Sequence, residues 1–140
     1  MDIDAAYAAL NRHDGEAYAS NFTEDGVLVD HVDGTRHQGR EAIRAYVKAM
    51  EDEFSSDFQV AEVDSFQTAD RFVSVWDMSG THDRSSQQPP LPATGKQFTI
   101  RGVVIGSLEG DKVKEETVLY NLAEFLAQVG LMPAPASTGG

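Results

Sequence analysis

The order in which helical and strand patterns follow one another constrains this fold most. Apolar residues at helical spacing occupy most of the first 54 positions, and long alternating segments occupy most of residues 58–120. The helical patterns cover residues 2–14, 16–21 and 39–54, and the strand patterns cover 27–32, 58–64, 65–67, 71–79, 97–108 and 113–120. Helices that precede a run of long strands predict an α+β fold with a largely antiparallel sheet, rather than a βαβ array.

A curved sheet of this kind can wrap around the N-terminal helices and enclose one concave pocket. Gly102 and Gly106, both inside one strand pattern, fit local bending of the sheet. A short amphipathic helix is expected to begin at Leu122, and Gly130 and Pro133 are expected to end it. The helix would therefore follow directly on the last strand.

The length of 140 residues is that of one domain, which we expect to span residues 1–133. The proline-rich segment 85–92 predicts a loop between neighbouring strands, and residues 134–140 predict a flexible tail. Neither a basic and apolar leader nor a run of 18 apolar residues occurs in the sequence. A chain without cysteine suits a reducing compartment, so we expect a cytoplasmic protein.

The chain is strongly acidic, with 23 acidic and 11 basic residues and a formal net charge of −12. Such a charge repels phosphate backbones and anionic membrane surfaces. The composition therefore argues against nucleic acids and membranes as partners, and it assigns no function by itself.

Four stretches of the sequence resemble one known family, in the same order along the chain. They are residues 21–27, 39–44, 76–96 and 110–133. Together they resemble the SnoaL-like polyketide cyclases, which belong to the nuclear-transport-factor-2-like superfamily. The resemblance implies a cone-shaped α+β fold, a homodimer, and chemistry that needs no metal or cofactor.

In that family, an aspartate after the terminal aromatic residue of the last strand serves as the general base. It removes a proton next to a carbonyl of a polyketide ester, and the enolate then closes a ring. Here that position holds Asn121, which follows Tyr120. An amide cannot take up this proton, so Asn121 would instead bind a carbonyl, position a water or cap the helix beginning at Leu122. Strand alternation places Asn121 on one face with Val113, Thr117 and Leu119, and we expect this face to line the pocket.

Three other side chains are candidates for moving the proton. His82 follows a strand with a large apolar face, and its imidazole could shuttle protons near neutral pH unless it lies in a solvated loop. Asp30 and His31 are adjacent on the first strand, so only one of them can face the pocket. Periodicity does not decide between these two residues. A carboxylate buried at Asp30 could replace the missing base. The alternative is a solvated acidic strand end, which the nearby Asp33 favours.

The remaining candidates concern ligand binding. Arg101 is a cation within an apolar strand, and it either clamps an anionic or carbonyl oxygen or faces outward to pair with Glu115 or Glu116. The aromatic side chains Tyr7, Tyr18, Phe72 and Trp76 offer flat surfaces for a ring system, although such residues also build cores. No spaced set of ligands for a metal site occurs in the sequence.

The resemblance therefore implies a cofactor-independent cyclase or isomerase that acts on a hydrophobic carbonyl compound such as a polyketide. One alternative is a binding or dimerisation module of the same fold, which Asn121 at the position of the base favours. Another is an epoxide hydrolase like that of the limonene-epoxide branch of the superfamily. That branch places an aspartate two residues after an arginine, whereas Arg101 is followed by Gly102 and Val103.

Overall fold

A computed structural model describes residues 1–87 and 90–133 of the chain. The helices are α1 (Ile3–Asn11), α2 (Gly15–Ala19), α3 (Arg40–Glu53) and α4 (Leu122–Gln128). The strands are β1 (Phe22–Asp30), β2 (Thr35–Gln38), β3 (Gln59–Gln67), β4 (Arg71–Thr81), β5 (Ser86–Gln87), β6 (Pro90–Leu91), β7 (Gln97–Glu109) and β8 (Lys112–Tyr120). The expected tail over residues 134–140 lies outside the described residues.

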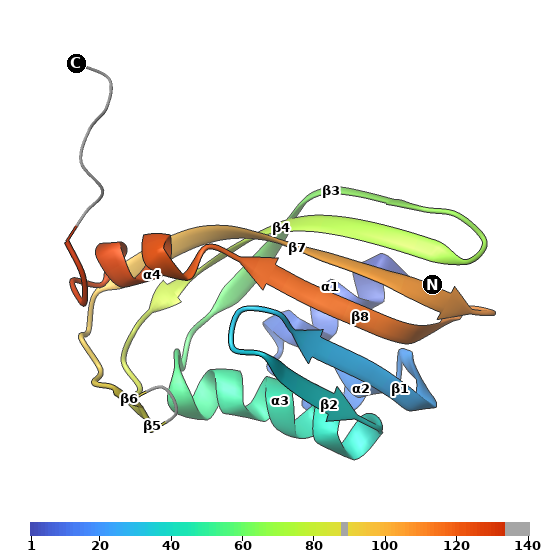
Figure 1. Ribbon diagram of the computed structural model, residues 1–140, viewed down its shortest axis with the longest axis horizontal. Coiled ribbons are helices and arrows are strands. Elements are labelled where there is room, and N and C mark those ends of the chain that lie inside the picture. Colours follow the sequence, from blue (N-terminus) through green and yellow to red (C-terminus); the bar gives the residue numbers. More distant parts are fainter. Residues whose placement is uncertain (88–89, 134–140) are drawn as a thin grey trace.

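Six strands form one curved sheet in the order β2-β1-β8-β7-β4-β3 (Figure 1). Neighbouring strands in this sheet are antiparallel except β1 and β8, which run parallel. Helices α1, α2 and α3 lie on one side of the sheet, and α4 continues from the end of β8 (Figure 1). The predicted α+β class, with helices against a mostly antiparallel sheet and a short C-terminal helix, is confirmed.

Local sequence signals account for the helix starts. The side chain of Asp2 caps α1 by accepting a hydrogen bond from the amide of Ala5 at 3.0 Å, and Asp14 caps α2 in the same way. Helix α3 buries Ile43 and Val47, which lie one turn apart on the face toward the sheet. These helices supply the apolar layer on which the sheet folds.

The structure differs from the predicted elements at three places. Strand β1 begins at Phe22 rather than Val27, and β2 pairs with it although the sequence signalled only a turn there. β2 escaped prediction because its short sequence Thr-Arg-His-Gln has no apolar alternation. The proline-rich segment, predicted as a loop, contains the small antiparallel pair β5 and β6.

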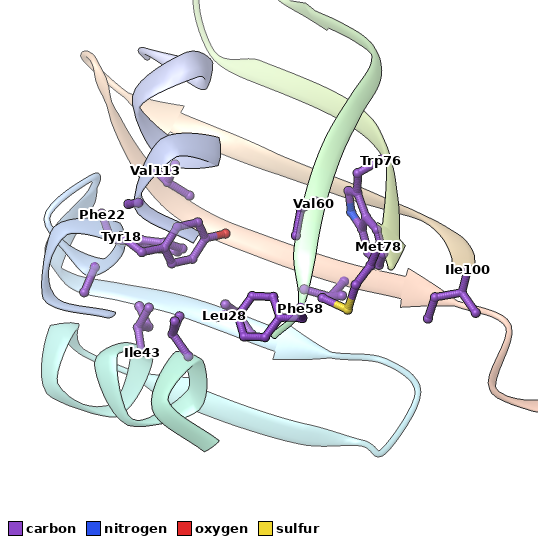
Figure 2. Close-up of a cluster of buried hydrophobic side chains, with 14 of the residues drawn as sticks. Tyr18, Phe22, Leu28, Ile43, Phe58, Val60, Trp76, Met78, Ile100 and Val113 are labelled. Atoms are coloured by element: carbon purple, nitrogen blue, oxygen red, sulfur yellow. The ribbon is translucent and has the colours of Figure 1, made fainter. Parts of the chain in front are cut away.

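The core lies between the concave face of the sheet and the three N-terminal helices. Figure 2 shows buried side chains from both layers facing one another, with Ile43 on α3, Leu28 on β1 and Trp76 on β4. The ring of Tyr18 extends from α2 toward this interior (Figure 2). The layers thus enclose a region whose lining is largely apolar.

Two glycines of β7 make room for aromatic rings on the concave face. Gly102 pairs with Trp76 on the neighbouring strand β4, and Gly106 pairs with Phe72 on the same strand. A Cβ atom at Gly102 would overlap the indole ring of Trp76, and one at Gly106 would overlap the ring of Phe72. Both rings therefore lie directly over backbone that carries no side chain.

A β-bulge in β8 determines which of its side chains point inward. Val113 pairs with Leu108 and Glu115 pairs with Ser107, so Lys114 is an extra residue without a partner on β7. Beyond this bulge the buried positions of β8 are Glu116 and Val118. One inserted residue thus shifts the alternation of the whole second half of the strand.

Candidate active site

The concave side of the sheet and helices α1, α2 and α3 surround a cavity of about 430 Å³. Most of its wall is aliphatic or aromatic, including Leu28, Val60, Phe72, Trp76, Ile100 and Val118. Four residues expected to contact a ligand line this cavity, namely Trp76, Phe72, Tyr7 and Tyr18. A hollow of this size and lining suits a small hydrophobic molecule.

The carboxyl group of Asp30 lies in the cavity wall at the end of β1. Asp30 is only 4% exposed. Oδ1 accepts hydrogen bonds from the amides of Val32 at 2.9 Å and Asp33 at 3.2 Å, and Oδ2 accepts one from the hydroxyl of Tyr46 at 2.8 Å. The neighbouring His31 is exposed in the following turn. Of this adjacent pair, the structure therefore places Asp30 in the cavity.

Glu116 is a second buried carboxyl group in the same cavity, and the sequence had not suggested it. It is 4% exposed, and the hydroxyl of Tyr18 donates a hydrogen bond to its Oε2 at 2.7 Å. Burial raises the pKa of Glu116 to about 7, although the hydrogen bond from Tyr18 acts in the opposite direction. A carboxyl group with this pKa exchanges protons near neutral pH.

The two carboxyl groups project from the same face of neighbouring parallel strands. Leu28 pairs with Glu116, and Asp30 pairs with Val118, two residues further along both strands. Asp30 and Glu116 are therefore diagonal neighbours on the concave side of the sheet. Each has its own tyrosine partner, which comes from α3 for Asp30 and from α2 for Glu116.

A third tyrosine, Tyr7 on α1, also contributes a hydroxyl to the cavity. This hydroxyl lies 2.5 Å from the Oγ atom of Ser74, which in turn lies 2.6 Å from the Oγ atom of Ser65. Burial raises the pKa of Tyr7, Tyr18 and Tyr46, and each hydroxyl keeps its proton at neutral pH. The cavity wall thus carries the neutral hydroxyl groups of these tyrosines beside the buried carboxyl groups of Asp30 and Glu116.

The prediction that Asn121 faces the cavity is wrong. Asn121 is exposed, and its side chain caps α4 by accepting a hydrogen bond from the amide of Glu124 at 3.1 Å. Thr117 and Leu119 share its side of β8, and Leu119 borders a shallow hollow on the outer face of the sheet. The alternation was assigned correctly among these three residues, but grouping Val113 with them was wrong. The bulge at Lys114 leaves Val113 in the cavity wall and turns the other three outward.

Arg101 also points to the outer face. Its Nε atom donates to Oδ1 of Asp77 at 2.9 Å and its Nη2 atom donates to Oδ2 at 3.1 Å. This pairing lowers the pKa of Asp77. The outward alternative was therefore the correct one, but the partner is Asp77 on β4 instead of Glu115 or Glu116 on β8.

His82 is buried outside the cavity lining. It is 1% exposed, its Nδ1 atom lies 3.0 Å from Oγ1 of Thr94, and its ring packs against Phe54 and Phe125. Burial lowers the pKa of His82, which favours the neutral imidazole. The structure thus brings Asp30 together with Tyr7, Tyr18, Phe72 and Trp76, and it separates them from His82, Arg101 and Asn121.

Sequence alternation contained one signal for Glu116. Val118 and Tyr120 share its side of β8, and an apolar residue beside an aromatic one indicates a buried face. The charged run Lys114-Glu115-Glu116 obscures this signal, because consecutive charged residues are typical of a solvated segment. Within residues 1–87 and 90–133, no group of three or more His, Asp or Glu side chains is placed to hold a metal ion. The helices in these ranges are too short or too polar to cross a membrane.

The fold is shared with several solved structures. A candidate polyketide cyclase from Xanthomonas campestris is 24% identical, with a TM-score of 0.79 over 91% of this chain and 93% of the other. A protein from Catenulispora acidiphila with a ketosteroid isomerase-like fold, solved with trimethylamine, is 20% identical, with a TM-score of 0.79 over 91% of each chain. A candidate hydroxylase from Streptomyces galilaeus is 18% identical, with a TM-score of 0.78 over 96% of this chain and 82% of the other.

These identities show a common fold and leave the reaction open, since the three proteins carry different descriptions. No curated protein matches the sequence. The model of the SnoaL-like domain family matches residues 3–116, which include α1 to β7 and the buried carboxyl groups of both Asp30 and Glu116. Because this match extends over most of the sequence and the cone-shaped fold agrees with it, the chain belongs to the SnoaL-like domain family.

Proposed function

We propose that this protein is a cofactor-independent cyclase or isomerase for a hydrophobic carbonyl compound such as a polyketide. The observation that carries the proposal is the Asp30 carboxyl group, which is buried in the wall of an otherwise apolar cavity beside tyrosine hydroxyls. A base in such surroundings can remove a proton from carbon next to a carbonyl group.

In this proposal Asp30 takes the proton and the electron pair of the broken C–H bond forms an enolate. The hydroxyl of Tyr7 is a neutral donor in the same cavity and can stabilise the enolate oxygen. In a cyclase the enolate carbon then attacks a second carbonyl of the same molecule. In an isomerase the proton returns to a different carbon.

The cavity walls support a neutral and largely apolar substrate. Flat rings from Phe72 and Trp76 lie over glycine backbone and offer broad surfaces to a ring system. Two buried carboxyl groups and a net charge of −12 disfavour an anionic substrate. Excluding water from this hollow would also strengthen the electrostatic contribution of each hydroxyl.

The proposal can be tested by exchange of the α-protons of 2-tetralone in D2O, followed by NMR. We expect saturable exchange with the natural protein and a loss of about 100-fold or more in Asp30→Asn. Asp77→Asn is the matched control, because it removes a carboxylate from the outer face. Exchange that persists undiminished in Asp30→Asn, or that never exceeds the buffer rate, would contradict the proposal.

A non-catalytic ligand-binding module is the second candidate function. It is favoured by Asn121, an amide at the position of the family base that acts as a helix cap in this structure. Trp76 is the single tryptophan of the chain and lines the cavity, so its fluorescence reports binding. Binding of 2-tetralone without exchange would support this second candidate.

We also infer that the protein forms a homodimer through the outer face of the sheet. Phe66, Val73 and Ile105 form an apolar row across β3, β4 and β7, with Phe66 62% and Ile105 38% exposed. Such a row on a sheet face favours association. Light scattering should find a dimer that Ile105→Glu converts to a monomer, with Asp111→Asn as the control. A natural protein that is monomeric at high concentration would contradict this.

A further inference from the structure

We propose that Glu116, as a neutral carboxylic acid, donates from Oε1 to the carbonyl oxygen of the bound substrate and protonates that oxygen as the enolate forms. This inference rests on the proposed function and adds the acid that complements Asp30. It assigns a direction to the site, with the α-carbon of the substrate toward Asp30 and its oxygen toward Glu116.

The hydrogen bonds of Glu116 leave one oxygen for a ligand. Tyr18 donates to Oε2, so in the neutral acid the proton resides on Oε1. Oε1 of Glu116 has no hydrogen-bond partner within residues 1–87 and 90–133. Every fully buried side-chain nitrogen or oxygen in these ranges has a partner, so Oε1 is not sealed off by the protein. Because the residue borders the cavity, Oε1 is the Glu116 atom that can meet a ligand there.

The two carboxyl groups stand in contrasting surroundings. Asp30 accepts three hydrogen bonds, and two of them come from backbone amides that cannot move away. Glu116 accepts one hydrogen bond, from Tyr18, and its neighbours across the strands are Leu28 and Gly106, over which the ring of Phe72 lies. Donors favour a carboxylate and apolar surroundings favour the acid, so a base and an acid face the same cavity.

The proposed step balances without any added reactant. Asp30 takes the α-proton, the C–H pair becomes the new C=C bond, and the carbonyl π pair moves to the oxygen. That oxygen takes the proton of Glu116, which leaves an enol, a protonated Asp30 and a Glu116 carboxylate. Return of both protons, or ring closure followed by proton exchange with water, restores the starting state.

The pH dependence expected from Glu116 must be distinguished from that of other titratable groups nearby. Tyr18, Tyr7 and Tyr46 face this part of the cavity from the three helices, and burial keeps all three protonated through neutral pH. Tyr120 on the same strand has a pKa raised by burial as well. The rim of the cavity carries His37, Asp33 and Glu53 in addition to Asp30 on the wall. His37 is the histidine among these residues, so it needs a variant of its own.

Binding of a ketone therefore provides a test that does not require turnover. We would titrate 9-fluorenone against the fluorescence of Trp76 from pH 5.5 to 8.5. The affinity should fall about tenfold or more as pH rises through the midpoint of Glu116, because a neutral donor becomes a carboxylate facing a carbonyl oxygen. In Glu116→Gln the affinity should not vary with pH.

Three variants separate this role from a merely structural one. Glu115→Gln lies on the exposed side of β8 and should keep the pH dependence, as should His37→Gln. Tyr18→Phe removes the hydrogen bond that favours the Glu116 carboxylate, so the midpoint should move to higher pH. Equal pH dependence in the natural protein and Glu116→Gln, or no binding of the ketone, overturns the inference.

Exchange of 2-tetralone distinguishes this inference from the proposed function. Exchange that requires Asp30 but is as fast in Glu116→Gln, at every pH, overturns only the role of Glu116. If the affinity for 9-fluorenone depends on pH in the natural protein but not in Glu116→Gln, and no exchange occurs, the proposed reaction is overturned. The hydrogen bond from Glu116 is then still supported. Exchange that declines above neutral pH, and is lost by about 100-fold in Glu116→Gln, supports both.

Discussion

The hydroxyl of Tyr46 donates a 2.8 Å hydrogen bond to Oδ2 of Asp30, joining the middle of α3 to the last residue of β1. The same carboxyl group accepts the amides of Val32 and Asp33 in the turn that follows β1. A single side chain therefore orders a helix, a strand end and a turn around one wall of the cavity.

Removing this hydroxyl should weaken the fold. In Tyr46→Phe, Asp30 loses one of three donors while the ring of residue 46 remains, and we expect the free energy of unfolding to fall by about 2 kcal/mol. Urea denaturation measures this change. Tyr120→Phe is the matched control, because no described residue forms a hydrogen bond with that hydroxyl. An equal loss in both variants would show that the hydrogen bond to Asp30 contributes nothing.

Asn121 should matter for stability rather than for chemistry. Its side chain caps α4, so Asn121→Ala should lower the free energy of unfolding by about 1 kcal/mol, whereas Asn121→Asp should keep the cap. Exchange of 2-tetralone per folded molecule should be the same in both variants as in the natural protein. A large increase of exchange in Asn121→Asp would instead point to a base on this side of the sheet.

Glu116 should make the stability depend on pH in a defined direction. Its pKa is about 7 in the folded protein and 4.5 as the reference value, so the folded state holds a proton that the unfolded chain releases between these values. The free energy of unfolding should therefore fall as pH rises from 4.5 to 7, by roughly 3 kcal/mol from this group. Below 4.5 and well above 7 its contribution should not change.

The contribution of Glu116 is isolated by comparing the change in unfolding free energy with pH between the natural protein and a variant. Urea denaturation at pH 5 and pH 8 should show a smaller loss of stability in Glu116→Gln than in the natural protein. Glu115→Gln, on the exposed side of the same strand, should follow the natural protein. Parallel behaviour of all three proteins would mean that Glu116 titrates normally in the folded state.

Gly102 should tolerate no side chain while Trp76 is present. A Cβ atom at position 102 would overlap the indole ring, and we expect Gly102→Ala to destabilise the protein by about 1–3 kcal/mol. Combining it with Trp76→Leu should cost less than the sum of the two single changes, because the smaller side chain relieves the overlap. Thermal unfolding of the four proteins completes the cycle. Strict additivity would rule out the contact as the cause.

The sequence predicted the fold well because its main signals are local. Caps at Asp2 and Asp14, the amphipathic pattern of α3 and the long alternating segments each determine an element within a few residues. β2 was missed because its pairing with β1 depends on a neighbouring strand rather than on its own composition. Strand order, including the parallel pair β1 and β8, likewise depends on contacts between distant segments.

The candidate site was predicted less completely, and β8 explains why. Alternation correctly grouped Thr117, Leu119 and Asn121, but which group faces inward depends on the unpaired residue Lys114. A bulge is a property of two strands together and has no reliable signature in one of them. Asp30 was among the candidates because it lies on a strand with apolar residues, although the nearby Asp33 favoured a solvated strand end, whereas Glu116 lies in a run of charges.

The unpaired Lys114 gives this protein an unusual route for change. If Lys114 itself paired with Ser107, the register of β8 would slip by one residue, which would turn Glu116 toward water and bring Thr117 and Leu119 inward. The polarity of the cavity lining therefore depends on the pairing register of one strand, with no substitution among the residues that form it.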